Sequence, residues 1–261
     1  MNIIVAVKGV IDSESDIQVS AGAVVSDNHA TVINPFDEVA LTAAVALKQA
    51  GLANEILAVS VGDSACQDVL NVALAIGADQ ALWVASDAPV ASLTVAKTLA
   101  KIAEERQADL LLFGQQAIDS DAGQTGAMTA ALLDWGQATA VSALTIDPDQ
   151  QSVIATCDSD AGSETLSVKL PAVLTTTLRL NEPPPIRLSQ WLAAKDKPLK
   201  QRPLSDLGIA TTPPLSVQNL RAVSQHRKGV MLKDAAELAN LLADYLPAAP
   251  SQAKNHTENR R

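Results

Sequence analysis

The first half of the chain alternates short aliphatic runs with longer amphipathic stretches. Short apolar runs bounded by polar residues are typical of buried strands, predicted at residues 3–7, 55–60, 81–84 and 109–113. The amphipathic stretches between them predict helices at about residues 37–50, 64–76 and 91–106. Strands that alternate with helices pair in parallel through right-handed crossovers. The sequence therefore predicts an α/β domain with a three-layer parallel sheet.

After Thr139 the pattern changes to short β-rich runs separated by turn residues. These runs are expected at residues 143–146, 152–155, 165–170 and 172–176. Residues 17–32 are short, partly polar and rich in turn signals, so they are expected to form a β excursion before the first helix. A domain with a β-rich extension is thus expected over residues 1–183.

The Pro-rich stretch 182–185 ends the compact part of the chain. A short helix is expected at residues 188–194, and an arm without regular elements at 196–229, where four prolines occur. One more amphipathic helix is expected at 233–246, and a disordered tail at 247–261. An arm without a core of its own needs another surface, so residues 184–246 are expected to pack on a partner subunit.

Composition and charge narrow the function classes. The 261 residues include 19 basic and 29 acidic ones, a formal net charge of -10, which disfavours nucleic acid and anionic membranes as ligands. Cys66 and Cys157 give neither a disulfide framework nor a metal-binding spacing. No apolar run reaches the ~20 residues of a membrane span, and the first residues lack a basic secretory n-region. A cytoplasmic protein is expected, or a protein of the mitochondrial matrix if the source is eukaryotic.

The predicted helix starts lie where the chain leaves a strand or an extended segment. The first follows Asn34-Pro35-Phe36-Asp37-Glu38, where the Asn34 side chain can cap the helix and Pro35 fits its first position. Ligands of open parallel sheets bind at the carboxyl ends of the strands. These helix starts are therefore candidate ligand sites, although simple capping accounts for each signal taken alone.

The most informative segment is the loop 114–126, between a strand and an Ala-rich helix that starts at Ala127. Small residues that enter a helix present free amides and the positive end of the helix dipole to a phosphate group. Thr125 can add a hydroxyl donor, while Gly123 and Gly126 allow close approach to the backbone. The loop contains no Lys, so it is not a Walker A loop. A polar connection with good capping residues remains the alternative.

Catalytic motifs are not found in the sequence. There is no GxSxG, HExxH or Cys-x-x-Cys motif and no strand-linked GxGxxG, and no pair of nucleophile and base can be defended. The residues alone thus indicate a nucleotide-binding α/β domain with a protruding arm, and not an enzyme.

Several motifs occur together that resemble those of electron transfer flavoprotein β subunits. They are Asn34-Pro35-Phe36-Asp37-Glu38, the segment from Gly114 to Asp119 with Gln124-Thr125-Gly126, the segment from Asp134 to Thr139, and Leu170-Pro171-Ala172-Val173 followed by residues 178–183. The resemblance covers residues 1 to about 210 well and the C-terminal part only loosely. It implies an adenine-nucleotide hydrolase-like fold and a heterodimer with an α subunit that holds the redox FAD.

The resemblance also implies a structural AMP in this chain. Its expected contacts are Ala6, Asn34, Pro35, Phe36, Asp37, Val61, Ser120, Asp121, Ala122, Gly123, Gln124, Thr125, Gly126, Ala127, Met128, Thr129, Ala130 and Ala131. Phe36 is expected to lie near the flavin of the α subunit as well. Some members of the family hold a second FAD in place of AMP, usually with an apolar residue where Thr125 stands. The hydroxyl of Thr125 favours AMP.

The loop after the Pro-rich stretch is expected to dock on partner dehydrogenases. Leu188 matches the leucine that anchors this loop in the partners, with Ile186 and Trp191 beside it. An ordinary core leucine is the alternative for Leu188. The chain departs from the family at Gly9 and Ser13, which bears on the surroundings of the flavin. Asp158 keeps a carboxylate where the family has one facing the flavin domain.

The function implied is an electron-transfer subunit. It accepts electrons from dehydrogenases of the acyl-CoA type, as in fatty acid oxidation, and passes them toward a quinone oxidoreductase. The alternatives are a stand-alone adenine-nucleotide-binding regulatory module and a bifurcating-type subunit with a second FAD.

Overall fold

The computed structural model describes residues 1–15, 17–20, 23–25, 31–149, 151–210, 220–221, 229–243 and 245. Contacts divide the chain into two units, Met1–Arg221 and Ala222–Arg261, and each unit is considered by itself. The predicted tail at 247–261 lies outside the described residues, as do most of residues 211–228.

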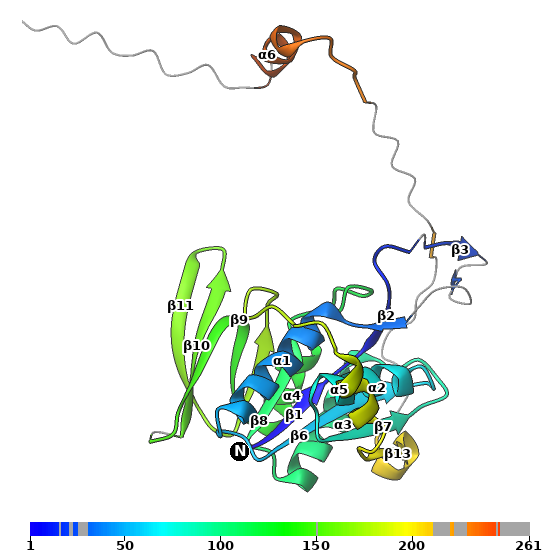
Figure 1. Ribbon diagram of the computed structural model, residues 1–261, viewed down its shortest axis with the longest axis vertical. Helices are drawn as coiled ribbons and strands as arrows, with labels where there is room; N and C mark the ends of the chain where they lie inside the picture. Colours follow the sequence, from blue (N-terminus) through cyan, green and yellow to red (C-terminus); the bar gives the residue numbers. More distant parts are fainter. Residues whose placement is uncertain are drawn as a thin grey trace, which may run out of the picture. The chain divides into compact units, whose positions relative to one another are not determined.

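The described part of the first unit is built on one nine-stranded sheet (Figure 1). Its strands, in spatial order, are β11 (Gly162–Lys169), β10 (Ser152–Ser159), β9 (Gly136–Asp147), β12 (Ala172–Thr176), β8 (Leu110–Gly114), β1 (Asn2–Ala6), β6 (Glu55–Gly62), β7 (Gln80–Ala85) and β13 (Leu199–Pro203). Neighbours from β9 to β13 pair in parallel, whereas β9, β10 and β11 form an antiparallel meander. The predicted α/β fold with a mostly parallel sheet is confirmed.

Helices cover both faces of the parallel part of this sheet. Successive side chains of a strand point to opposite faces, so Ile3 and Val5 of β1 join one core and Ile4 joins the other. The first core is closed by α1 (Pro35–Gln49) and α2 (Cys66–Ile76). The second is closed by α3 (Ser92–Arg106) and α4 (Thr125–Leu133). Strands buried on both faces explain the continuous aliphatic runs of the sequence.

Two small antiparallel pairs lie before α1. Strand β2 (Gly9–Ile11) pairs with β5 (Thr31–Ile33), and β3 (Val19–Ser20) pairs with β4 (Ala23–Val24). Strands β3 and β4 and most of β5 lie in the β excursion expected at 17–32, whereas β2 precedes it. Ala21, Gly22 and residues 26–30 of that range lie outside the described residues.

The prediction that residues 196–229 lack regular elements is wrong for their first part. Leu199–Pro203 forms β13, which pairs in parallel with β7, and the 3-10 helix η1 (Leu204–Leu207) buries its two leucines in the second core. The strand fits because β7 would otherwise leave an edge of unpaired amides and carbonyls. Pro203 is tolerated at the last position of an edge strand, where no ladder hydrogen bond from its nitrogen is needed.

Helix α5 (Leu188–Ala194) is present as predicted and packs on α2, with Ala194 buried. In the second unit, α6 (Ala235–Ala243) forms within the predicted range 233–246, and none of its residues is buried. No described helix has the length and apolar character that crossing a membrane requires.

Candidate functional site

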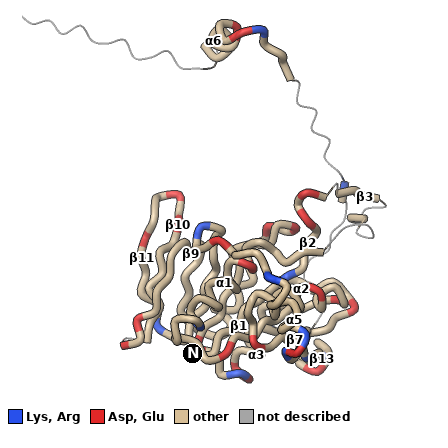
Figure 2. Tube along the Cα trace, viewed as in Figure 1, with Lys and Arg blue, Asp and Glu red and all other residues tan. Residues whose placement is uncertain are grey.

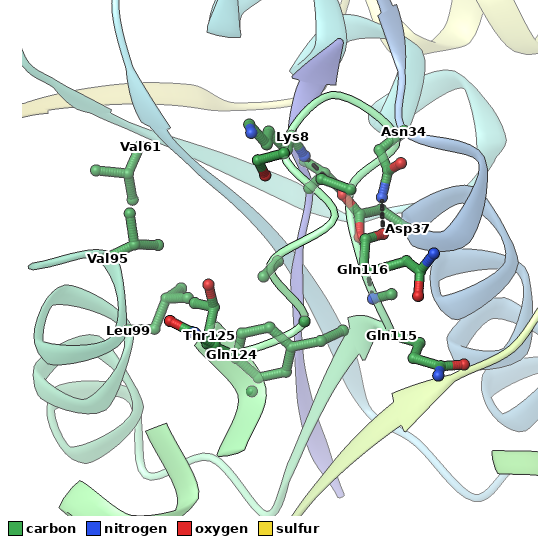
Figure 3. A pocket seen from close by; sticks show the side chains of 18 of the residues that line it. Lys8, Asn34, Asp37, Val61, Val95, Leu99, Gln115, Gln116, Gln124 and Thr125 are labelled. Atoms are coloured by element: carbon green, nitrogen blue, oxygen red, sulfur yellow. Dashed lines mark hydrogen bonds between the residues drawn. The ribbon is translucent and has the colours of Figure 1, made fainter. Parts of the chain in front are cut away.

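A cavity of about 360 Å³ opens at the carboxyl edge of the sheet, beside the ends of β1, β6 and β8 (Figure 3). Its walls also include the first turns of α3 and α4. The predicted site residues that line it are Ala6, Asn34, Asp37, Val61, Ser120, Gly123, Gln124, Thr125 and Gly126. Segments far apart in the sequence thus meet at this edge, as the strand-end rule for open parallel sheets predicts.

The other predicted AMP contacts do not line this cavity. They are Pro35, Phe36, Asp121, Ala122, Ala127, Met128, Thr129, Ala130 and Ala131. On α4 the reason is helical geometry, because only its first turn reaches the cavity. Thr129 and Ala130 are 0% and 1% exposed and turn toward the protein interior. The AMP contacts proposed for these residues stay a prediction.

One wall of the cavity was missed in the sequence. It is apolar and is formed by Val59, Pro89, Val90, Val95 and Leu99, from β6, the segment after β7, and α3. Figure 3 shows Val61, Val95 and Leu99 on one side of the cavity, across from Asn34, Asp37 and Gln116. The strand-end rule, applied also to the carboxyl end of β7, would have pointed to residues 86–95.

Asn34 holds a loop rather than capping a helix. Its side chain makes no capping hydrogen bond to α1. Instead, Nδ2 donates to the carbonyl oxygen of Gln116 at 2.8 Å, and Oδ1 accepts from the amide of Ile118 at 3.3 Å. The side chain is fully buried. The predicted capping role is therefore wrong, and Asn34 instead fastens the loop after β8 to the start of α1.

Asp37 lies where the ends of β1 and β8 meet the start of α1, here called the junction. One carboxylate oxygen accepts the amide of Lys8 at 2.9 Å, and the other accepts the amide of Gly114 at 3.0 Å. Burial raises the pKa of Asp37 from 3.8 to about 7, against the opposing effects of hydrogen bonds from Asn34, Lys8 and Gly114 and of the Lys8 charge. The carboxyl thus ties the ends of β1 and β8 to α1.

Lys8 and Asp119 close this junction at the surface. The Lys8 Nζ contacts both carboxylate oxygens of Asp119, at 2.8 and 2.6 Å, and both side chains remain partly exposed. Among the described residues, Lys8 is the only Lys or Arg that lines the cavity, and its charge is already matched by Asp119. A bound anion must therefore be held mainly by main-chain groups.

The start of α4 offers such groups. The amides of Gly123, Gln124, Thr125 and Gly126 have no hydrogen-bond acceptor within the described parts of the chain. The first amides of a helix lack intrahelical partners and sit at its positive end. Together with the Thr125 hydroxyl, they suit a phosphate group. No cluster of His, Cys, Asp or Glu that can hold a metal ion occurs among the described residues.

An open groove lies on the surface beside the start of α1. It is lined by Pro35, Glu38, Val39, Leu178, Arg179, Asn181, Glu182 and Pro183. Phe36 is half-buried and lines neither this groove nor the cavity. Asp158 accepts hydrogen bonds from Ser142 and Ser163 and pairs with Arg179 at 3.3 Å.

The expected docking residues, Leu188 and Trp191 of α5 and Ile186 just before it, divide into two groups. Leu188 is 75% exposed and Trp191 39% exposed, whereas Ile186 packs against the first core. Leu188 is thus not a core leucine in this chain. Leu192, which is 56% exposed, was missed. Its spacing of four residues from Leu188 places both on one helix face, and that spacing is visible in the sequence.

The family model and the relatives that match this chain are all electron transfer flavoproteins. Residues 22–207 match the family model described as "Electron transfer flavoprotein domain". The chain is 40% identical over 244 residues to "Electron transfer flavoprotein subunit beta, mitochondrial" of Arabidopsis thaliana, covering 93% of this chain and 97% of that protein. It is 41% identical over 250 residues to "Electron transfer flavoprotein subunit beta" of Homo sapiens, covering 94% and 97%. For the protein of the same name in Bradyrhizobium diazoefficiens the identity is 39%, over 93% and 97%.

Proposed function

This chain belongs to the electron transfer flavoprotein β-subunit family, and we propose that it forms a heterodimer with an α subunit that carries the redox FAD. The bound FAD supplies the electron chemistry, and this chain supplies binding, orientation and docking. Electrons come from flavoprotein dehydrogenases of the acyl-CoA type and leave toward a quinone oxidoreductase. The compartment is the cytoplasm in a bacterium and the mitochondrial matrix in a eukaryote.

The cavity at the carboxyl edge of the sheet binds a structural AMP. The observation that carries this proposal is the combination, in one cavity, of free amides at the start of α4 and an apolar wall from β6 and α3. The amides and Thr125 hold the phosphate, and the apolar wall takes the base.

The size of the cavity favours AMP over a second FAD. Its volume of about 360 Å³ lies near the lower end of the range for small-molecule sites. AMP is less than half the size of FAD, which would have to extend well outside this cavity. The bifurcating-type alternative therefore has less support.

The α subunit covers the groove beside α1, with Phe36 near the flavin and Asp158 facing the flavin domain. Exposed apolar side chains on α6 pack on the same partner. Because no residue of α6 is buried among the described residues, a partner surface for its apolar side chains is part of the proposal.

Partner dehydrogenases bind the exposed face of α5. Leu188, Trp191 and Leu192 present apolar side chains there, while Ile186 holds the segment against the first core. An apolar anchor surrounded by polar residues is typical of transient protein contacts.

The test is to co-express the chain with its α subunit and purify the complex through a tag on this chain. A yellow heterodimer with one AMP, released on denaturation, is expected. A colourless chain that retains a nucleotide without an α subunit would overturn the proposal in favour of a stand-alone nucleotide-binding module.

The docking face is tested separately in the yellow complex. Leu188→Ala should raise the KM for the reduced dehydrogenase roughly tenfold, since burying a leucine contributes about 1.5–3 kcal/mol.

A further inference from the structure

Helix α5 is too short to be stable without support from the rest of the chain. It has seven residues, and among these described residues only Ala194 is buried. Isolated helices of fewer than about 12–15 residues are marginal in water, because forming the first turn is unfavourable. The conformation of α5 therefore depends on what the chain attaches to its two ends.

Both ends of α5 are attached. Before the helix, Ile186 packs against the first core. After it, the Lys197 amide donates to the Ala194 carbonyl at 3.1 Å, and the Lys197 side chain is bound at the carboxyl end of α2. Between these points α5 lies beside α2 (Figure 1).

Gln190 closes the first turn of α5. Its Oε1 accepts the Arg187 main-chain amide at 2.8 Å, and its own amide donates to the Arg187 carbonyl at 2.9 Å. Gln190 is the third residue of the helix, from which a Gln or Glu side chain can reach back to the residue before the helix. The Arg187 guanidinium has no acceptor and cannot return this hydrogen bond. The side-chain closure of the first turn therefore rests on Gln190.

The helix brings three exposed apolar side chains to one face. Leu188, Trp191 and Leu192 have the spacing i, i+3 and i+4, which gathers side chains on one side of a helix. In an extended segment, where side chains alternate, Trp191 would point away from the other two. α5 contains no charged residue that would interrupt this face (Figure 2). All three side chains can thus meet one partner only while the helix is formed.

Resting on the docking role of the proposed function, we propose that α5 is a preformed docking helix for an apolar groove of the dehydrogenase, and that Gln190 is its positioning residue. A helix that lays an apolar face into a groove is a common mode of protein recognition. If the segment had to order on contact, its affinity would fall with the fraction of time it spends in the competent conformation. Gln190 acts by keeping that fraction high, through Leu188, Trp191 and Leu192.

The experiment uses the full chain in complex with its α subunit and a dehydrogenase reduced by its own substrate. Gln190→Met keeps the side-chain length but removes the acceptor, and should raise the KM for the reduced dehydrogenase about threefold. Gln190→Gly also weakens the helix interior and should raise it about tenfold. Gln190→Glu keeps the acceptor and should stay within about twofold of the wild type. The kcat should be unchanged in all three, because the docked complex is the same.

Hydrogen exchange in the complex without dehydrogenase separates positioning from direct contact. The amides of α5 should exchange faster in Gln190→Met and Gln190→Gly, in the order of their KM values, and at the wild-type rate in Gln190→Glu. Faster exchange with an unchanged KM would show that docking needs no preformed helix and would overturn the proposal. A raised KM without faster exchange would overturn it as well, since Gln190 would then contact the partner directly.

Leu188→Ala distinguishes failure of this proposal from failure of the docking face itself. A raised KM for Leu188→Ala beside wild-type values of KM and exchange for Gln190→Met would leave the docking face in place and refute the role of Gln190. An unchanged KM for Leu188→Ala would instead contradict the docking face, and with it the proposal that rests on it.

Discussion

Asp37 is the residue at which three separate segments of the chain converge. Its two carboxylate oxygens hold the amides of Lys8 and Gly114, and Asn34 fastens the following loop. Burial favours the neutral carboxyl, so the folded chain binds its proton more tightly than the unfolded chain does. The resulting stabilisation is complete below the ordinary pKa of 3.8 and is lost as the pH rises toward about 7.

Removal of the Asp37 carboxyl should therefore change how stability depends on pH. The unfolding free energy of the wild-type chain, relative to Asp37→Asn, should fall between about pH 5 and 7 and level off near pH 8, with a slope of at most about 1.4 kcal/mol per pH unit. Urea unfolding at a series of pH values measures it. Asp160→Asn, which removes one carboxylate at an exposed turn, is the matched control. Parallel pH profiles for the wild type and Asp37→Asn would contradict the raised pKa.

Gly114 allows the close approach on which this junction depends. A Cβ at this position would lie 2.6 Å from the Phe36 Cβ and would collide with the Asp37 carboxylate. Gly114→Ala should destabilise the chain by about 1–3 kcal/mol and lower the AMP content of the purified complex. Thermal unfolding and nucleotide release measure the two effects. Gly229→Ala places a methyl group in open space and should change neither.

For single residues, the sequence predicted which residues lie at the cavity better than it predicted what each of them does. The glycines and Thr125 of the 114–126 loop were identified from the chemistry of phosphate sites, and the structure places them in the cavity. The role of Asn34 was mistaken, because capping is a local preference while its actual partners lie 82 and 84 residues away. Such long-range hydrogen bonds leave no periodic signal in a single sequence.

Among the elements, strand β13 follows a lysine that is anchored at the end of α2. Lys197 Nζ donates to the carbonyl oxygens of Leu74 and Ala78, at 2.9 and 2.7 Å, at the carboxyl end of α2. A cation is favourable at this end of a helix dipole. Burial lowers the pKa of Lys197 from its ordinary value.

Lys197→Met should loosen this attachment. The chain should lose about 1–3 kcal/mol of stability, because hydrogen bonds from a charged group are lost at a half-buried site. Hydrogen exchange should accelerate in β13 and at its register partners in β7. Lys195→Met, at an exposed position two residues earlier, is the control. Unchanged exchange in β13 would show that strand pairing alone holds it.

The elements that the sequence predicted are those with strong local patterns. The strands β1, β6, β7 and β8 are continuous aliphatic runs because helices cover both of their faces. β13, in contrast, reads Leu-Lys-Gln-Arg-Pro, which lacks β-branched residues and ends in proline. Its conformation depends on the open edge of β7, a property of the sheet rather than of the segment.

At the scale of the whole molecule, α6 of the second unit carries apolar side chains that remain exposed among the described residues. Leu238, Leu241 and Leu242 are spaced as on one helix face and are 42–45% exposed. Leu241→Asp should weaken binding to the α subunit, because a charge would enter an apolar contact. Retention of the α subunit on a tagged chain at increasing salt measures it. Asn240→Asp introduces the same charge on α6 and should leave binding unchanged.

The order of strands in the sheet also bears on synthesis of the chain. Its carboxyl-proximal strand β13 completes the edge at β7, a strand made more than a hundred residues earlier. While the ribosome is still translating the segment between them, the nascent domain exposes β7 as an open edge next to an apolar core. Open edges of this kind are sites of aggregation. The interval before residue 203 leaves the exit tunnel is therefore when the chain most needs a ribosome-associated chaperone.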